Sequence, residues 1–448
     1  LYTYAAGAKG VPHSVTFRLP KEWGLACGLG PTTPNVTFHS PGYDVLADNP
    51  LLLGRFDTYR FQSHGAEVLW CLDRGLDPDD KANRGAFGEM LKTIVDYQGE
   101  LMGDLPFDRY VFQFVRSGGF WGLEHLNSTT IGMNGRVWQD DWTTADSLHA
   151  HEFFHLWNIK RIRPEPLGPF DYSQPVRTND LWWAEGVTDY YANLTMVRTG
   201  LWSEDAFWSE VQREISGLRN NSAWATMSAE EASRSVWEGA RPRISYYTKG
   251  MLLGLCLDLW IRDESGNDHT LDDVMRFLME FYADEGVGFP AGALRRTVDG
   301  VTGLDSEWFF DSYVSGVEPL DYDRFLDAAG MTFEDETKAT ATAGFSVSGR
   351  ALRVTRLRHD TPPHLAGLRA GDEVKGVNGT EVKSRRDWRT VTKQFQPDSD
   401  VVLVVRREGE RLTFTFPTTL VVRHLPQIVY EGPARTDLFG RDRAESER

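Results

Sequence analysis

The sequence predicts an α+β protein of several domains, with strands near both ends and helices in the middle. At 448 residues the chain is long enough for two or three domains. Residues 1–78 alternate apolar and polar positions in short runs between Gly- and Pro-rich turns, a pattern typical of β structure. From about residue 82 apolar residues recur at helical spacing, and beyond residue 344 short alternating runs return.

These changes of period divide the chain into segments. The expected boundaries are 1–78 for a β-rich segment, 79–333 for a mainly helical domain with a small sheet, 340–425 for a second β-rich module, and 426–448 for a charged C-terminal tail. Residues 334–344 are polar and small, as in a linker. Residues 435–448 are charged and poor in apolar side chains, so we expect them to be frayed.

Composition excludes several classes of protein. Hydrophobic residues make up 41% and charged residues 25% of the chain, as in ordinary globular proteins, and no apolar run approaches ~18 residues. A net charge of −17 argues against nucleic acid as a partner. The three cysteines, Cys27, Cys71 and Cys256, are too few and too scattered for a disulfide framework or a thiolate metal site.

The start of the chain is unusual. It begins at Leu1 without a Met and without the basic and apolar stretches of a signal peptide. We therefore expect a truncated or processed form, and the compartment, bacterial periplasm or cytoplasm, stays open.

The helical domain opens with a helix over 84–97, followed by strands over 108–115 and 128–133. Between these strands lies Gly122-Leu-Glu124. A glycine lets the backbone approach a ligand closely, and Glu124 can pair with a cationic amine. A surface loop with one acid is the alternative. The strands predict a small sheet whose edge can bind an extended peptide.

The pattern His-Glu-Phe-Phe-His occupies residues 151–155 within a helical stretch. Residues four apart share one face of a helix, so the imidazoles of His151 and His155 can point at a common centre. Two neutral imidazoles at this spacing suit Zn²⁺, and Glu152 can take a proton from a water that the metal activates. An amphipathic helix with two buried, hydrogen-bonded histidines is the alternative.

A third metal ligand is available thirty residues after His155. A catalytic zinc ion needs three protein ligands and an open position. Glu185 lies in 181–191, whose apolar residues recur at helical spacing, so its carboxylate can face the first helix. Asp189, one turn later, is the candidate to orient a zinc-binding histidine through its second N–H group. A solvated pair of acids is disfavoured, because the segment is strongly aromatic.

Tyr247 stands just before the long apolar helix 251–261. A phenol at the start of such a helix can donate to an oxyanion as it develops. Tyr246 is the alternative if the helix begins one residue earlier. A core tyrosine is the simpler interpretation of either residue taken alone.

Together these motifs resemble the glycyl aminopeptidase family of zinc metallopeptidases, which have a thermolysin-like catalytic domain and a C-terminal PDZ domain. The resemblance rests on Gly-Leu-Glu-His at 122–125, His-Glu-Phe-Phe-His-Leu-Trp-Asn at 151–158, Trp-Trp-Ala-Glu-Gly-Val-Thr-Asp at 182–189, and Tyr-Thr-Lys-Gly at 247–250. It implies that residues 1–78 are the C-terminal part of an N-terminal β domain.

The resemblance also implies roles for single residues. The expected ligands of one Zn²⁺ per chain are His151, His155 and Glu185, with Glu152 as general base, Tyr247 stabilising the transition state, and Glu124 and Gly122 binding the substrate's free amino terminus. It implies a preference for small first residues, Gly or Ala. The bulk of Phe120, Trp121 and the Trp182-Trp183 pair is compatible with a small first pocket.

The stretch between the second histidine and Glu185 is longer than in related aminopeptidases, so a proline-rich loop, 159–178, is inserted beside the site. Its basic residues Lys160, Arg161 and Arg163 either touch substrate or pair with acids, and we favour pairing.

The C-terminal module carries Asn378-Gly379, which suits a type I′ turn, and a groove helix over 385–395. The stretch Ala343-Gly-Phe-Ser346 stands where a carboxylate-binding loop would lie but matches the usual pattern poorly. The PDZ module is therefore either a packed structural domain or one that binds or guides peptides.

Three functions compete. The favoured one is a zinc aminopeptidase acting on peptides with a free amino terminus. A zinc endopeptidase on the same scaffold is the second, and Glu124 decides between the two. A non-catalytic peptide-binding protein that depends on its PDZ domain is the third.

Overall fold

The structure is a computed structural model that describes residue 4 and residues 7–30, 37–77, 84–141, 143, 146–169, 171–238 and 243–440. The chain forms two compact units, of which the first contains Leu1–Phe333 and Ile428–Arg448 and the second contains Glu334–Gln427. The second unit is therefore an insertion in the chain of the first.

The N-terminal segment is built from short strands, as predicted. β1 (His13–Thr16) pairs with β3 (Thr37–Ser40), and β2 (Gly24–Ala26) pairs with β4 (Leu52–Gly54), both antiparallel. The short helix α1 (Tyr43–Ala47) follows β3. This segment brings Asp48 into contact with Leu126 and Lys160 of the helical part of the first unit.

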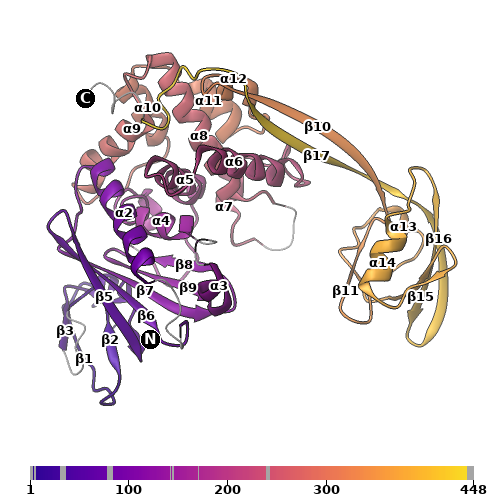
Figure 1. Ribbon diagram of the computed structural model, residues 1–448, viewed down its shortest axis with the longest axis horizontal. Helices are drawn as coiled ribbons and strands as arrows, with labels where there is room; N and C mark the ends of the chain where they lie inside the picture. Colours follow the sequence, from indigo (N-terminus) through magenta and orange to yellow (C-terminus); the bar gives the residue numbers. More distant parts are fainter. Residues whose placement is uncertain are drawn as a thin grey trace. The chain divides into compact units, whose positions relative to one another are not determined.

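A five-stranded sheet follows in the order β5-β6-β7-β9-β8 (Figure 1). Its strands are β5 (Phe56–Ser63), β6 (Ala66–Asp73), β7 (Arg109–Ser117), β9 (Ser128–Asn134) and β8 (Trp121–Glu124). β6, β7 and β9 run parallel, while β5 and β8 are antiparallel to their neighbours. β8, which carries Gly122 and Glu124, is thus an edge strand, whereas the sequence predicted only a stretch between two strands there.

Helices cover the sheet and continue to residue 327. They are α2 (Arg84–Met102), α3 (Gly135–Asp141), α4 (Asp146–Phe154), α5 (Thr188–Arg198), α6 (Glu204–Arg219), α7 (Ala229–Arg234), α8 (Tyr246–Ser265), α9 (Leu271–Leu278), α10 (Ala293–Thr302), α11 (Glu307–Phe309) and α12 (Tyr322–Asp327). Wide π-helical turns occupy Trp182–Val187, Met279–Ala283 and Phe310–Val314, and a 3-10 turn occupies Glu165–Leu167.

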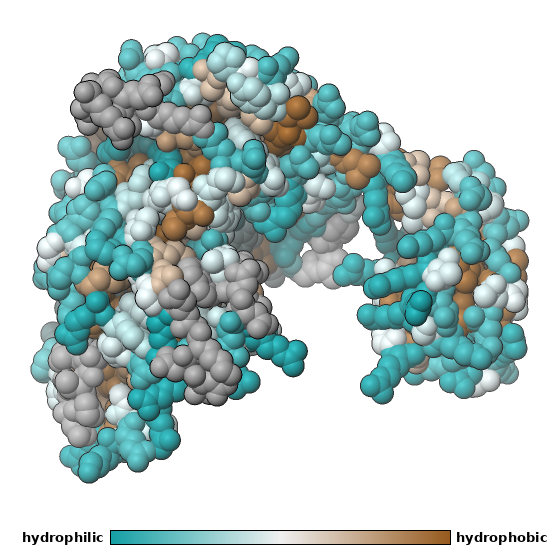
Figure 2. Space-filling model, in the orientation of Figure 1, coloured by the Kyte–Doolittle hydropathy of each residue, from teal (hydrophilic) through white to brown (hydrophobic). Residues whose placement is uncertain are grey.

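One large apolar core joins the sheet to these helices. α8 is its centre, since the stretch Lys249–Arg262 is buried on every side. The face of the molecule seen in Figure 2 is largely hydrophilic, in keeping with this burial of apolar side chains. No helix among the described residues is long and apolar enough to cross a membrane.

The second unit is a β-rich module with the fold predicted for a PDZ domain. Its sheet has the order β11-β12-β13-β15-β16, with β14 paired to β13. Its elements are β11 (Ser346–Ser348), β12 (Arg353–Thr355), α13 (Pro362–Leu365), β13 (Glu373–Val377), β14 (Thr380–Glu381), α14 (Arg385–Thr392), β15 (Asp400–Arg407) and β16 (Glu410–Pro417). Asn378 and Gly379 both have positive φ, as the predicted turn requires.

The prediction that residues 334–344 form a linker is wrong. β10 (Met331–Thr342) pairs instead with β17 (Thr419–Tyr430) in a two-stranded ribbon. The hydroxyl of Thr342 donates to the carbonyl of Thr419 at 3.1 Å, and the ring of His424 lies 2.7 Å from the Asp335 carboxylate. The polar residues of β10 pair with β17, which lies about eighty positions later in the chain. Local composition does not reveal so distant a strand partner.

The frayed end predicted for residues 435–448 is also wrong where the structure describes it. Two buried arginines of the first unit need acceptors, and this segment supplies them: Arg198 donates to the carbonyl of Leu438 at 2.9 Å and Arg262 to that of Asp437 at 3.0 Å. Leu438 is buried, and Arg435 pairs with Asp263. Residues 441–448 lie outside the described part of the chain.

The close contact between the start of α8 and the turn that carries Glu185 predicts a stability effect. A methyl group added at Gly250 would lie 2.1 Å from the carbonyl oxygen of Trp182, whereas one added at Gly217 in α6 meets nothing within 4 Å. We expect Gly250→Ala to lower the free energy of unfolding by about 1–3 kcal/mol, and Gly217→Ala to raise it by about 0.5–1 kcal/mol. Denaturant unfolding of both variants checks this, and equal effects would contradict the contact.

Candidate active site

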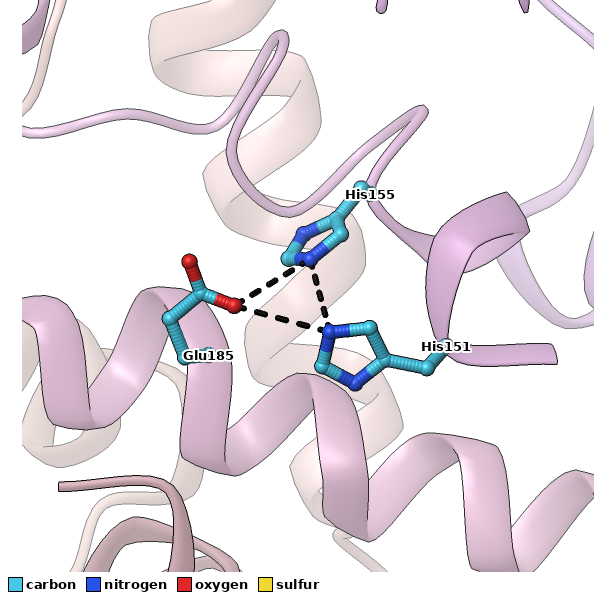
Figure 3. A group of neighbouring side chains, drawn as sticks. All are labelled: His151, His155 and Glu185. Atoms are coloured by element: carbon cyan, nitrogen blue, oxygen red, sulfur yellow. Dashed lines mark hydrogen bonds and ion pairs between the residues drawn. The ribbon is translucent and has the colours of Figure 1, made fainter. Parts of the chain in front are cut away.

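Three side chains converge on one point between α4 and the turn Trp182–Val187 (Figure 3). The Nε2 atoms of His151 and His155 are 2.9 Å apart. Glu185 Oε2 lies 3.5 Å from His151 Nε2 and 3.3 Å from His155 Nε2. Among the described residues this is the one group of His, Cys, Asp and Glu side chains whose ligand atoms gather closely enough to hold a metal ion.

The outer nitrogen of each imidazole is already engaged. Nδ1 of His155 donates to the carbonyl of Asn158 at 2.8 Å. Nδ1 of His151 faces Asp189 Oδ1 at 2.7 Å, close but not aligned for a linear hydrogen bond. Both Nδ1 atoms therefore carry the proton, and both Nε2 lone pairs point toward the Glu185 carboxylate. Three acceptors with no donor among them require a proton or a cation at their centre.

Glu185 lies on a wide turn, where the sequence predicted an ordinary helix. Residues 182–187 are π-helical, and α5 begins after them at Thr188. The side-chain amide of Asn158 donates to the carbonyl of Trp183 at 2.9 Å, and the hydroxyl of Thr188 accepts from the same amide at 3.1 Å. Asn158 thereby joins the loop after His155 to the turn that carries Glu185. Such inserted turns are frequent at functional sites.

Glu152 is buried behind the two histidines, against the edge strand. A Cβ added at Gly122 would lie 1.9 Å from Glu152 Oε1, so the glycine leaves the space that this carboxyl group occupies. Thr129 Oγ1 lies 3.4 Å from Glu152 Oε2. Burial raises the pKa of Glu152 to about 7, against the opposing effect of His151 and His155. The structure thus gives a reason for a glycine here, the close approach of Glu152, while the approach of a ligand to its backbone stays a prediction.

The pKa of Glu185 is shifted in the opposite direction from that of Glu152. Burial acts to raise the pKa of this carboxyl group, but the charge and hydrogen bonds of His155 and His151 in their protonated form outweigh burial and hold the pKa well below its usual range. Glu185 is thus ionised where Glu152 is poised to exchange a proton. Two carboxyl groups with separated pKa values in one site are typical of acid–base chemistry.

Tyr247 lies in the first turn of α8, which Ser245 caps by accepting from the backbone N–H of Thr248. Its ring lies 6.2 Å from the ring of His151, and the ring of Tyr246 stacks on its other side at 4.9 Å. Burial and then the charge of Glu185 raise the pKa of Tyr247, so its hydroxyl keeps the proton and can donate. Of the two tyrosines, Tyr247 is the one that faces the histidines.

Glu124 ends the edge strand, and its charge reaches Glu152 and His155, whose pKa values it helps to raise. The next residue, His125, directs Nδ1 at Asp48 Oδ1 over 3.4 Å. Lys160 binds the same carboxylate at 2.5 Å. Burial acts to raise the pKa of Asp48, but His125 and Lys160 outweigh it and lower that pKa.

Two of the three basic residues of the inserted loop have structural roles, as favoured from the sequence. Lys160 pairs with Asp48, and Arg161 donates to the carbonyls of Leu126, Leu156 and Pro106. The third, Arg163, forms no such pair among the residues that the structure describes.

Sequence reasoning missed three residues that support the site. Asn158 follows His155 by three positions, so the spacing could have revealed it. Thr129 and Asp48 are brought to the site by strand pairing and by the N-terminal segment, and no local signal marks them.

Comparison with known proteins agrees with this geometry. Three family models match the chain: the M61 peptidase N-terminal domain at residues 1–55, the M61 glycyl aminopeptidase at residues 144–253, and a PDZ domain at residues 329–418. These matches confirm the family resemblance and the prediction of a metallopeptidase with a C-terminal PDZ domain. They support a metallo-aminopeptidase.

A solved structure shows the same fold over nearly the whole chain. A crystal structure of an aminopeptidase N family protein from Idiomarina loihiensis is 24% identical, with a TM-score of 0.85, over 97% of this chain and 80% of that one. An M1 zinc metallopeptidase from Deinococcus radiodurans is 18% identical, with a TM-score of 0.47, over 69% of this chain and 64% of that one. No curated protein matches the sequence significantly.

The contact between Gly122 and Glu152 predicts a catalytic effect. A methyl group at position 122 would overlap the Glu152 carboxyl group and displace it, whereas one at Gly119 meets nothing within 4 Å. We expect Gly122→Ala to lower peptidase kcat by on the order of 10²-fold or more, approaching the loss in Glu152→Gln, and Gly119→Ala to have little effect. Steady-state kinetics of the three variants measure this. Near-normal turnover in Gly122→Ala would show that Glu152 has room to move.

Proposed function

We propose that this chain is a zinc-dependent aminopeptidase that removes residues from the free amino terminus of peptides. The observation that carries this function is the convergence of His151, His155 and Glu185 beside a buried Glu152, with Glu124 next to them at the edge of the sheet. The family matches support the same class of enzyme.

The three converging groups fit zinc. Two imidazole nitrogens and one carboxylate oxygen are a common ligand set of catalytic zinc sites, which leave one position open. Asp189 and the carbonyl of Asn158 hold the two rings in the tautomer that a metal ligand requires. When bound here, zinc would acidify the attacking water and polarise the scissile carbonyl.

Glu152 is assigned the proton transfers. Its pKa of about 7 allows the carboxylate to accept a proton from the attacking water and then to deliver it to the leaving amine near neutral pH. The backbone of Gly122 and the hydroxyl of Thr129 restrict where this carboxyl group can lie. It is therefore held in place before substrate arrives.

Tyr247 is assigned to the oxyanion. Its hydroxyl stays protonated, and its ring lies beside His151 at the start of α8. A donor in this position stabilises negative charge that develops on the carbonyl oxygen of the scissile bond.

Glu124 is assigned to the substrate's α-ammonium group. A carboxylate at the end of an edge strand can bind that group by a charge-assisted hydrogen bond, and an extended substrate can lie along the strand. An enzyme that requires this contact cleaves only the first peptide bond, which favours an aminopeptidase over an endopeptidase. The PDZ unit would bind or guide peptides.

The preference for Gly and Ala stays a prediction from the family resemblance. Trp182 and Trp183, whose bulk suggested a small first pocket, are buried core residues and so do not restrict a substrate. Phe120 and Trp121 are exposed near the edge strand.

The metal assignment is tested by metal content. We expect one zinc ion per purified chain, and loss of most of it in His155→Ala, because removing one of three ligands weakens the site strongly. His359→Ala in the second unit should keep it. Elemental analysis measures both, and full zinc content in His155→Ala would refute the assignment.

Tyr247→Phe should lower kcat by roughly 10²-fold with little change in KM, as for the loss of one oxyanion donor. Tyr246→Phe is the matched control and should retain most activity. An effect of Tyr247→Phe on KM alone would mark the residue as part of substrate binding instead.

The aminopeptidase assignment is tested by blocking the substrate. Alanine 4-nitroanilide should be cleaved and its N-acetyl form should not, because acetylation removes the charge that Glu124 binds. Glu124→Ala and the isosteric Glu124→Gln should both lose activity on the free substrate. Efficient cleavage of the blocked compound would favour the endopeptidase and remove Glu124 from the site.

A further inference from the structure

A cavity of about 470 Å³ opens beside Glu124, within the range of small-molecule pockets. Its walls come from α1 and Asp48, from the end of β8 and the two residues after it, and from the inserted loop between Ile159 and Pro169 together with Tyr172. All of these belong to the first unit. Because Glu124 lies at its wall, the cavity adjoins the place assigned to the first residue of a substrate.

Most charges around this cavity are neutralised by partners. Asp44 lies 3.0 Å from Lys9 and accepts from the hydroxyl of Tyr172 at 2.9 Å. Asp48 and Lys160 pair with each other at 2.5 Å. Two charged groups on the wall are left without an ionic partner among the described residues, the carboxylate of Glu124 and the guanidinium of Arg163.

Arg163 is held in place by its surroundings. Its backbone carbonyl accepts from the N–H of Phe289 at 2.8 Å. The backbone N–H of Glu165, two residues later, donates to the carbonyl of Phe289 at 3.0 Å. A Cβ added at Gly168 would lie 2.5 Å from Arg163 Nε, so the guanidinium group packs directly on the glycine backbone. The side chain is half-buried. The guanidinium group thus lies at the cavity wall with no ionic partner among the described residues, so it can bind an anionic group of a ligand.

A second polar group in the same cavity is also unpartnered. His125 lines the cavity and is 93% buried, with a relative exposure of 7%. Its Nδ1 is directed at Asp48, while its Nε2 is buried and has no hydrogen-bond partner among the described residues. Buried ring nitrogens are normally hydrogen-bonded, so this atom also indicates a polar ligand.

We propose that this cavity is the subsite for the side chain of the substrate's first residue, that it accepts an acidic side chain, Asp or Glu, and that Arg163 determines this specificity. The inference rests on the proposed aminopeptidase function and names its substrate class.

The charges match such a substrate. An amino-terminal Asp or Glu carries an α-ammonium group, for Glu124, and a side-chain carboxylate, for Arg163. Guanidinium and carboxylate groups form strong two-pronged hydrogen bonds. The methylene groups of the substrate can pack on Leu126 and Leu167 of the wall. Neither Gly nor Ala uses the volume or the cation, so this subsite extends the specificity beyond small residues.

The experiment compares kcat/KM for 4-nitroanilides of Glu, Asp, Gln and Ala, with the zinc-loaded full chain. Gln is the isosteric neutral comparator for Glu. We expect the wild-type protein to favour Glu over Gln on the order of tenfold or more, and Arg163→Leu to bring the ratio close to one. Arg177→Leu is the matched control: Arg177 lies in the same loop but pairs with Glu238 away from the cavity, so the ratio should stay at the wild-type value.

Arg163→Glu should reverse the preference, toward Lys and Arg substrates. Metal content and thermal unfolding of each variant show that it is folded. If an unfolded Arg163 variant prevents the comparison, Arg163→Lys, which keeps the charge, should retain a Glu over Gln preference.

Cleavage of the Ala substrate with equal rates for Glu and Gln, or a ratio that Arg163→Leu leaves unchanged, overturns the subsite alone. No cleavage of any free-amine substrate overturns the proposed function, and the subsite with it.

Discussion

The site depends on three hydrogen-bond acceptors that meet with no donor among them. His151, His155 and Glu185 can be held this close only because the surrounding structure fixes each of them and a cation can neutralise them. Asn158 links both halves, since its carbonyl orients His155 and its side-chain amide binds the turn that carries Glu185. The same turn packs on the start of α8 through Gly186 and Gly250, so the position of Tyr247 follows from the position of Glu185.

A second constraint is steric. Glu152 occupies the volume that a side chain at position 122 would fill, and this contact sets the distance between α4 and the edge strand β8. A peptide that adds to the outer edge of β8 would therefore pair with the strand that contacts the buried carboxyl group. Gly122 thus connects the strand edge that can bind substrate with Glu152, the group proposed to transfer protons. Because of this contact, β8 and α4 must keep a fixed distance from each other.

The features that could be predicted from the sequence are those that depend on residues close together in the chain. The two histidines and the Asn378-Gly379 turn depend on neighbours within a few residues, and each lies where the pattern placed it. Failures occurred where the partner is distant. β10 seemed a linker because β17 follows about eighty positions later, and residues 435–440 seemed frayed because Arg198 and Arg262, which bind them, are far upstream. The π-helical turn was missed because Asn158, which bonds to it, lies outside the segment.

The partners of the charged residues in the inserted loop could not be predicted from the sequence either. Lys160, Arg161 and Arg163 look alike in sequence, and pairing with acids was favoured for all three. Asp48, which neutralises Lys160, lies 112 positions upstream, and Arg161 is satisfied by three carbonyl groups rather than by an acid. Counting charges along the chain cannot separate these cases, because the partner is set by folding. Only after Lys160 and Arg161 are accounted for does Arg163 stand apart, as a cation that lines the same cavity as Glu124 and has no ionic partner among the described residues. Two such charges at one cavity match a ligand that carries both signs.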